Sequence, residues 1–440
     1  MQLAIVAVGG YGRGELNPFS DMDVMFLHGD SRMIDPRVNE TVQAILYMLW
    51  DIGFKVGHST RSVAMAIKHA NSDMLSKTAL LESRFVAGED KLFEEFRRRF
   101  VADCVESHVD QYIRERIDNQ TERHGKFGHT VYMQEPNVKN GCGGLRDYQN
   151  LLWMAYFKER VKDTPGLVEK KLIDDHERRM LDKAYDFLLR VRTELHYLNK
   201  RSMDVIPLGQ QLPLANRLGY DEKNILRRTE AVMRDYYQHA RNIFNLTEQV
   251  CERLALKQPE PSKVGGLLGF LRKTKGAKVE RFDGFYSLEG RLYPDSTNVF
   301  KEDPCRMMRM FLHMQQRRLR MSPELQQLAR RKVHRIVDRT FQYSKTARET
   351  FMEICSHKGD VGEILRAMHQ VDFLGQYLPE FGQLTCLVQH EFFHRYTADE
   401  HTLVCIDKLD QLIDTSNPKL SGYREVFQKL ADPFVLYLAL

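Results

Sequence analysis

Two aspartates near the start of the chain, Asp21 and Asp23, have a spacing that suits metal binding. They open an apolar stretch, Val24–Leu27, that is typical of a β-strand. Because side chains alternate across a strand, both carboxylates project from the same side. Such a pair opposes its own ionisation unless a cation joins it, and hard oxygen ligands suit Mg²⁺. The spacing therefore predicts a magnesium site at the two aspartates.

A glycine turn precedes this pair and follows a strand expected at Leu3–Val8. Without a Cβ atom, the backbone at Gly9 and Gly10 can approach a triphosphate closely and offer N–H groups to its oxygens. Arg13 could add positive charge against the phosphates, or pair instead with Glu15 or an aspartate. The alternative for the whole segment is a hairpin turn with capping acids.

The glycine turn followed by Asp-x-Asp resembles the polymerase-β-type nucleotidyltransferase superfamily. In that superfamily two metals, ~3.5 to 4 Å apart, clamp the attacking and leaving oxygens, and a third carboxylate comes from a later strand. Glu82 is our candidate, because we interpret the apolar run Thr78–Gly88 as a buried strand that bears one acid. The alternative for Glu82 is a salt bridge to Arg84.

Five separated blocks of sequence make the resemblance more specific. The blocks are Gly9–Leu16 with Ser20–Asp23, Trp50–Gly53 with Val56–Ser59, Glu135–Lys139 with Gly143–Asp147, Met233–Tyr237, and His394–Thr397 with Asp399–Leu403. On these residues the chain resembles the bacterial PII uridylyltransferase/uridylyl-removing family of bifunctional nitrogen sensors. They span nearly the whole chain, so a chance match is an unsatisfactory explanation.

The resemblance implies transfer of UMP from UTP to a tyrosine of the nitrogen regulatory protein PII. Asp21 and Asp23 would hold Mg²⁺, and Glu82 would complete the site or help to deprotonate the tyrosine. The triphosphate would be cradled by Gly9, Gly10 and Ser20. Positioning and electrostatics would supply most of the catalysis.

A second glycine turn, within residues 135–147, carries a lysine and an arginine. Lys139 and Arg146 flank the turn and could face the phosphates of the nucleotide. The alternative is a loop that fastens the catalytic domain to the helices, with Arg146 paired to Asp147. The sequence fits both interpretations.

The resemblance also implies an HD phosphodiesterase that removes UMP with a divalent metal, and His401 corresponds to its first ligand. His390, His394 and His401 could share one helix face as a metal site. However, Thr397 and Glu400 have the spacing of a capping box, which predicts a helix starting directly after Thr397. The family's His-Asp pair and its glutamine-sensing ACT domains are missing from this sequence, so we expect the hydrolase to be missing too.

The periodicity of apolar residues predicts an α+β fold with several parts. Helical spacing dominates residues 150–253, a cluster of Pro, Gly and Lys marks residues 257–276, and alternation around glycines at 281–294 indicates a hairpin. The expected parts are a polymerase-β-like nucleotidyltransferase domain at 1–120, a helical nucleotidyltransferase-associated domain at 121–256, a linker and hairpin at 257–300, and an incomplete all-α HD domain at 301–440.

Composition excludes several classes of protein. Apolar residues make up 42% and charged residues 28% of the 440, as in globular proteins, and no run approaches the ~20 apolar residues of a membrane span. Seven scattered cysteines argue against a disulfide framework, and we expect a cytoplasmic protein. The net charge of +5 is mild, and the basic runs Arg317–Arg320 and Arg330–Lys332 are typical of solvated helix faces rather than a nucleic-acid patch.

Two rival functions stay open. The first is another protein nucleotidyltransferase, such as one that adenylylates glutamine synthetase. The second is a catalytically silent module that binds PII or nucleotide.

Overall fold

The computed structural model describes the chain except for residues 1, 31–34, 256–278 and 388–395. His390 and His394 therefore lie outside the described residues. The chain forms two compact units, residues 1–131 with 135–257, and residues 132–134 with 258–440. Among the helices that the structure describes, none is long and apolar enough to cross a membrane.

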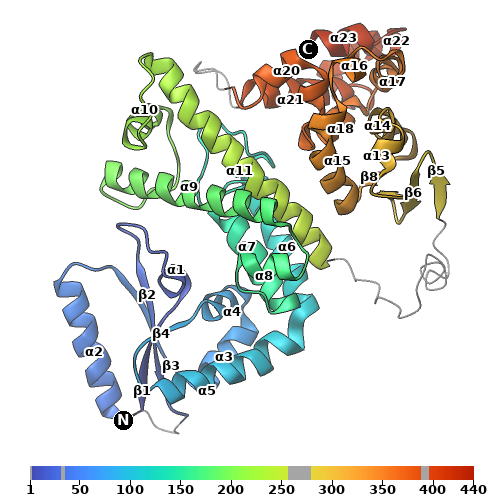
Figure 1. The fold of residues 1–440 in the computed structure, drawn as a ribbon. Coiled ribbons are helices and arrows are strands. Elements are labelled where there is room, and N and C mark those ends of the chain that lie inside the picture. The colour runs from blue at the N-terminus through green and yellow to red at the C-terminus, as the bar shows by residue number, and fades with distance from the viewer. Residues whose placement is uncertain (1, 31–34, 256–278, 388–395) are drawn as a thin grey trace. The chain divides into compact units, whose positions relative to one another are not determined.

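The first unit begins with a four-stranded sheet in the order β3-β2-β1-β4 (Figure 1). The strands are β1 (Leu3–Ala7), β2 (Met22–His28), β3 (Val56–Ser62) and β4 (Arg84–Gly88). β1 runs antiparallel to β2 and β4, and β2 runs parallel to β3. The strands expected at Leu3–Val8 and Val24–Leu27 are confirmed by β1 and β2.

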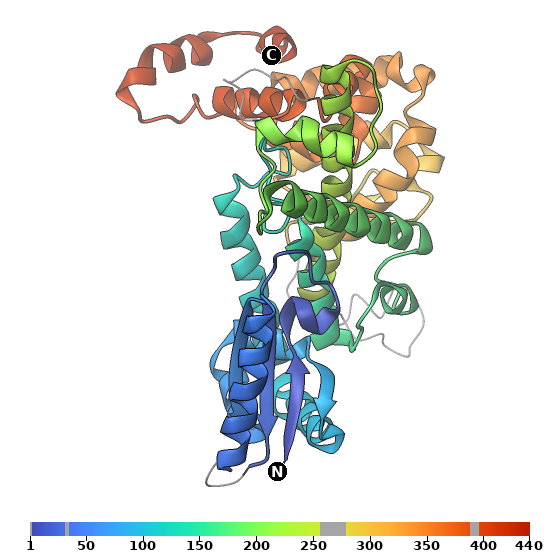
Figure 2. The same cartoon turned by 90° about the vertical axis from the view of Figure 1, so that its left-hand side faces the viewer.

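Helices accompany this sheet, and one of them covers a face of it. They are α1 (Gly9–Arg13), α2 (Pro36–Asp51), α3 (Val63–Ser72), α4 (Met74–Leu81) and α5 (Asp90–Phe100). Val38, Val42 and Leu46 recur every four residues on α2 and pack with β2 residues Val24 and Phe26. Figures 1 and 2 show α2 lying along the sheet. The site-bearing strand β2 is thereby held by a buried apolar layer.

The expected strand across residues 78–88 is wrong in its first half. Thr78 belongs to α4, Glu82 is the C-terminal cap of that helix, and β4 begins only at Arg84. Asp73 caps the start of α4 by accepting a hydrogen bond from the backbone N–H of Ser76 at 2.7 Å. A short apolar run is compatible with a helix or a strand, and here the N-terminal cap at Asp73 favours the helix.

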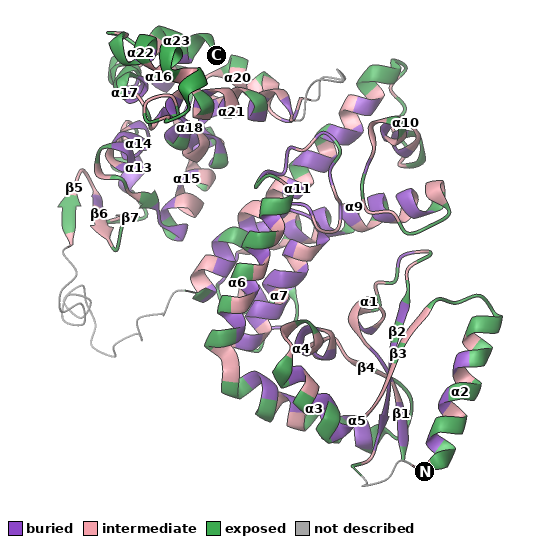
Figure 3. Cartoon of the chain, turned by 180° about the vertical axis from the view of Figure 1, so that it is seen from behind, coloured by how far each residue is buried: buried purple, intermediate pink, exposed green. Residues whose placement is uncertain are grey.

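The rest of the first unit is helical. A π-helix η1 (Val101–Val105) and a 3₁₀ turn η2 (Glu106–His108) lead into α6 (Val109–Lys126), α7 (Leu145–Glu159), α8 (Thr164–Glu169), α9 (Asp175–Asn199), α10 (Leu208–Arg217) and α11 (Ile225–Ala255). Buried residues recur along α7, α9 and α11 (Figure 3), as the apolar spacing predicts. Helix α6 runs through residue 120, where a domain boundary was expected.

The second unit combines a small sheet with many helices. The sheet has the order β5-β6-β7-β8, with β5 (Glu280–Phe282), β6 (Phe285–Leu288), β7 (Arg291–Pro294) and β8 (Arg320–Met321). β5, β6 and β7 are successive antiparallel neighbours, which confirms the expected hairpin. The fold is therefore a mixture of α and β elements in both units.

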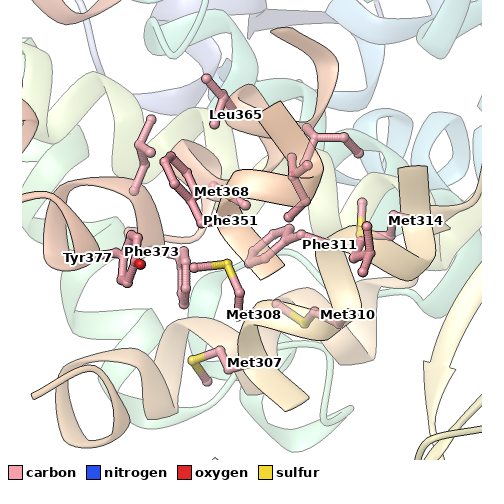
Figure 4. Packing of buried hydrophobic residues seen from close by; sticks show 14 of the residues in the cluster. Met307, Met308, Met310, Phe311, Met314, Phe351, Leu365, Met368, Phe373 and Tyr377 are labelled. Carbon is pink, nitrogen blue, oxygen red and sulfur yellow. The ribbon is translucent and has the colours of Figure 1, made fainter. Parts of the chain in front are cut away.

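Short helices form the core of this unit. They are α13 (Val299–Glu302), α14 (Arg306–Arg317), α15 (Pro323–Ile336), α16 (Arg339–Gln342), α17 (Lys345–Ser356), α18 (Val361–Gln370), α19 (Phe373–Tyr377), α20 (Pro379–Leu384), α21 (Ala398–Asp410), the 3₁₀ turn η3 (Pro418–Leu420), α22 (Ser421–Lys429) and α23 (Phe434–Ala439). Met308 and Phe311 of α14 pack with Phe351 and Phe373 (Figure 4).

Helix α21 starts at Ala398 as expected, but the capping box is wrong. The Thr397 hydroxyl donates to Oδ1 of Asp399 at 2.6 Å. Glu400 instead accepts a hydrogen bond from Nη1 of Arg366 at 2.9 Å. A tertiary ion pair has displaced the local cap that the sequence spacing suggests.

Candidate active site

A cavity of about 490 Å³ in the first unit brings most of the predicted site residues together. The predicted residues in its lining are Gly9, Gly10, Arg13, Ser20, Asp21, Asp23, Glu82, Lys139 and Arg146. They come from the β1–β2 region, the end of α4, the 135–147 turn and the start of α7. His401 belongs to the second unit and is not among them.

Asp21 lies directly before β2, and Asp23 is the second residue of that strand. Neither carboxylate has a hydrogen bond or ion pair with any residue that the structure describes. Glycines surround Asp23: a Cβ atom at Gly57 would lie 2.5 Å from its Oδ1, and one at Gly9 would lie 3.5 Å from its Oδ2. Burial and the charge of Asp21 raise the pKa of Asp23, while Lys139 acts in the opposite direction.

The glycine turn enters the cavity as the first turn of α1. Gly9 has a positive φ of 58°, which favours glycine, and the backbone N–H of Val8 donates to the carbonyl of Asp23 at 3.1 Å. This bond places the turn directly beside the aspartates. The buried Ser20 hydroxyl has no hydrogen-bond partner within the described ranges, so it is available to a ligand.

Arg13 makes two carboxylate contacts, and neither is with Asp21. Its Nε donates to Glu15 at 2.8 Å, and its Nη1 lies 2.6 Å from Oε1 of Glu82. The same Glu82 oxygen accepts a hydrogen bond from the Trp153 indole at 2.6 Å. Arg84, the alternative partner of Glu82, donates instead to the backbone carbonyls of Tyr11 and Gly12. The alternative interpretation, a salt bridge between Glu82 and Arg84, is therefore wrong.

Lys139 and Arg146 reach the cavity without a carboxylate partner in the described part of the chain. Burial and the charge of Arg13 lower the pKa of Arg146 to about 10. Burial and the charge of Arg192 lower the pKa of Lys139. Desolvated cations without a counter-ion are costly to hold, so they favour an anion in the cavity.

Asp147 does not pair with Arg146, contrary to the fastening-loop interpretation. It is fully buried and accepts hydrogen bonds from Nη2 of Arg123 at 2.5 Å, Nε2 of His124 at 3.0 Å and the Gly143 N–H at 2.7 Å. Burial opposes ionisation, but His124 and Arg123 outweigh it and lower the pKa of Asp147. The carboxylate therefore links α6, the glycine turn and α7.

Sequence reasoning missed three arginines of the lining: Arg116 and Arg123 on α6, and Arg192 on α9. The first two had a signal, because Arg116, Asn119, Gln120 and Arg123 follow the i, i+3, i+4, i+7 spacing of one helix face. Arg116 is 2% exposed and donates to Asn150 at 2.6 Å. Polar side chains at helical spacing on α6 were therefore a signal for a functional site, although the sequence alone does not show that this face is buried.

His401, the predicted HD ligand, lies in the second unit. His401 Nδ1 lies 3.7 Å from Sγ of Cys405. No group of three or more His, Cys, Asp or Glu side chains suited to a metal is found among the described residues. The predicted HD ligand thus remains a prediction.

Two family models match the chain. Residues 111–251 match the model described as GlnD PII-uridylyltransferase, and residues 285–377 match the third domain of uridylyltransferase GlnD.

Curated relatives named bifunctional uridylyltransferase/uridylyl-removing enzyme match nearly the whole chain. The Azospirillum brasilense protein is 36% identical over 436 residues, covering 99% of this chain and 46% of that protein. The proteins of a Bradyrhizobium strain and of Nitrobacter winogradskyi are 34% and 32% identical, covering 93% and 100% of this chain and 44% and 47% of their own lengths. The chain thus spans about half the length of the curated relatives it matches.

Proposed function

Because this chain belongs to the GlnD PII-uridylyltransferase family, we propose that its first unit transfers UMP from UTP to a tyrosine of the PII protein. One observation carries the proposal. Two carboxylates without hydrogen bonds to described residues, Asp21 and Asp23, share a cavity with two half-buried cations that have no ion pair with a described carboxylate. This combination suits a divalent cation bound together with a polyphosphate.

The donor set fits Mg²⁺. Asp21 and Asp23 offer hard oxygens that make no hydrogen bond or ion pair with described residues, and the glycines around Asp23 keep its oxygens accessible. When bound by these two carboxylates, Mg²⁺ would polarise the phosphoryl group and neutralise developing charge. It would also relieve the repulsion from Asp21, which adds to burial in raising the pKa of Asp23.

The other residues bind and orient the triphosphate in this proposal. The backbone at Gly9 and Gly10 and the hydroxyl of Ser20 supply hydrogen bonds, and Lys139 and Arg146 supply charge. Since the cations are already desolvated and held, they stabilise transition-state charge without reorganising. The alignment of the reacting groups then depends on the rigidity of this lining.

Glu82 receives a different role from the one that the sequence suggests. Its Oε1 already forms an ion pair with Arg13 and accepts a hydrogen bond from Trp153, and its side chain is only 7% exposed. We therefore infer that it positions Arg13 beside the phosphates rather than binding Mg²⁺. The tyrosine proton would then pass to solvent.

The remaining assignments concern the whole protein. We propose that uridylyl removal belongs to an HD domain that includes residues 301–440, with His401 as one metal ligand. Glutamine sensing would use ACT domains elsewhere in the protein.

We also propose a division of the first unit into two domains near residue 120. Since UTP is a metabolite of the cytoplasm, we propose a cytoplasmic location.

A transfer assay tests the proposed function. The chain is incubated with Mg²⁺, purified PII and one α-³²P-labelled triphosphate at a time. We expect label on PII from UTP, lost on chelation and in the double variant Asp21→Asn with Asp23→Asn. Label from ATP alone, or transfer that survives the double variant, contradicts the proposal. A PII variant with phenylalanine at the acceptor tyrosine controls for adventitious labelling.

A further inference from the structure

A second cavity of about 290 Å³ adjoins the candidate active site within the first unit. The two cavities share four lining residues, Arg13, Glu15, Glu82 and Trp153. The side chains that hold Arg13 in place therefore border both cavities. Nothing in the proposed transfer reaction uses this second space.

The lining of the second cavity is mainly apolar and aromatic. Its apolar members include Leu80, Leu81, Phe100, Val101 and Leu152. Tyr148 and Tyr185 stack with their ring centroids 3.8 Å apart. The hydroxyl of Tyr148 makes no hydrogen bond within the described part of the chain, so one polar group is available to a ligand. Such a lining suits a planar or apolar body.

A rare backbone element borders this cavity. Val101 starts the π-helix η1, and both Phe100 and Val101 contribute to the lining. π-Helical turns are uncommon because their hydrogen-bond geometry is poor, and they occur frequently at functional sites. The chain thus keeps an unfavourable turn where it borders a cavity, rather than continuing α5 directly into α6.

Charged residues complete the lining. Glu15 and Glu82 pair with Arg13 there, and two exposed cations remain. Arg97 and Lys162 both belong to it, and neither has an ion pair with a described residue. Burial and the charge of Arg97 lower the pKa of Lys162, so the two positive charges lie close enough to repel each other. Neighbouring like charges without a carboxylate between them attract an anion.

We propose that this second cavity binds a small amphipathic anion, with an apolar or aromatic body and one anionic group. Its binding modulates the binding of polyphosphate in the candidate active site. The body lies among Leu152, Tyr148 and Phe100, and the anionic group meets Arg97 and Lys162. The coupling path is short, because the Trp153 indole binds Glu82 and Glu82 binds Arg13. The binding step stands on its own, whereas the modulation rests on the proposed function.

Binding can be tested with 8-anilinonaphthalene-1-sulfonate, an aromatic anion whose fluorescence rises on burial. The chain has two tryptophans, Trp50 and Trp153, so Trp50→Phe leaves Trp153 as the only tryptophan that can donate energy when tryptophan is excited selectively. We expect saturable energy transfer from Trp153 to the probe in this background. Its absence at any probe concentration would overturn the site.

Variants locate the probe. Arg97→Glu with Lys162→Glu should weaken binding at least about tenfold, which corresponds to ~1.4 kcal/mol. Leu152→Phe should weaken it similarly by filling the space without changing charge. The matched control, Arg98→Glu with Lys171→Glu, makes the same charge change at exposed residues outside the lining and should leave binding within about twofold. Equal binding in all variants overturns the proposal.

Coupling is measured by titrating inorganic pyrophosphate calorimetrically with and without saturating probe. We expect pyrophosphate affinity to change by about fivefold and probe affinity to change reciprocally by the same factor. Unchanged affinities overturn the modulation. If pyrophosphate binds in neither condition while the probe still binds near Trp153, the proposed function fails and the second site stands.

Discussion

Hydrogen bonding divides the four carboxylates around the candidate active site into two kinds. Glu15 and Glu82 are engaged, since Glu15 accepts from Arg13 at 2.8 Å and from the Tyr185 hydroxyl at 2.6 Å. Asp21 and Asp23 have no such partners among the described residues. Glu15 and Glu82 therefore have a structural role, whereas Asp21 and Asp23 are available to a cation. Substitution should separate the two roles.

Asp23→Asn should abolish most transfer while leaving the fold intact. Removing one metal ligand costs several kcal/mol of transition-state stabilisation, so we expect a fall of about 10³-fold in transfer rate. Thermal stability should stay unchanged or rise, because a like-charge repulsion is removed. Transfer from labelled UTP and a thermal melt measure the two effects. Asp118→Asn, an exposed aspartate outside the cavity lining, is the control and should change neither.

Glu82→Gln should behave differently. The neutral side chain weakens the contacts to Arg13 and Trp153 and leaves buried groups poorly satisfied, which costs about 1–3 kcal/mol in unfolding free energy. Urea unfolding measures this loss, and a Mg²⁺ titration of transfer should keep its midpoint. A tenfold higher Mg²⁺ requirement at unchanged stability would instead identify Glu82 as a metal ligand, as the sequence suggests.

At the scale of elements, the 135–147 turn carries Lys139 and leads into α7 with Arg146. Its glycines are required by close packing: a Cβ atom at Gly143 would lie 2.0 Å from the carbonyl oxygen of Ala240 on α11, and one at Gly141 would lie 2.5 Å from that of Asn137. The turn therefore packs tightly against α11. This packing determines the positions of Lys139 and Arg146.

Gly143→Ala tests the seating of the turn. Gly143 has a φ of +69°, so alanine there is strained and also clashes with Ala240. Gly219 has a φ of +85° with no atom within 4 Å of an added Cβ, so Gly219→Ala isolates the strain alone. We expect about 1–2 kcal/mol of destabilisation for Gly219→Ala and a clearly larger loss for Gly143→Ala. Only Gly143→Ala should weaken pyrophosphate binding. Equal effects of both variants would contradict a packed turn.

Asp147→Asn tests the buried link between α6 and α7. Because the pKa of Asp147 is lowered in the folded protein, its stabilisation is full above the unfolded value of about 3.9 and is lost as the pH falls through the folded value. We expect a loss of about 3 kcal/mol at pH 7, since Arg123 and His124 lose their buried partner. Urea unfolding of both proteins should show this difference shrinking below about pH 4. A constant difference across pH would exclude the carboxylate charge as its source.

Local patterns predicted the parts of the site that short-range chemistry determines. The strand-glycine-strand order and the Asp-x-Asp pair follow from alternation and turn chemistry, and the structure has β1, α1 and β2 in that order. The secondary structure around Glu82 was mispredicted, because its apolar run fits two periodicities and the Asp73 cap decided between them. The partners of Asp147 and Glu400 were missed because they come from other helices.

At the scale of the whole molecule, each unit has a buried core of its own. In the first unit the core includes Leu188 on α9 and Met233 on α11, both fully buried. In the second it includes Phe311 and Phe373, whose rings lie 5.0 Å apart. A separate core is the physical basis of a separate unfolding step. Calorimetry should therefore show more than one transition.

Core truncations should move these transitions one at a time. Leu188→Ala removes about 2–5 kcal/mol from the first unit, and Phe311→Ala removes about 3–5 kcal/mol from the second, because each leaves a cavity. Scanning calorimetry should show each variant lowering a different melting temperature. If the transfer reaction belongs to the first unit, the temperature at which transfer is lost should fall with Leu188→Ala. The same temperature should stay unchanged in Phe311→Ala. A single transition lowered by both variants would instead make the two units one cooperative structure, and transfer would then be lost with the whole chain.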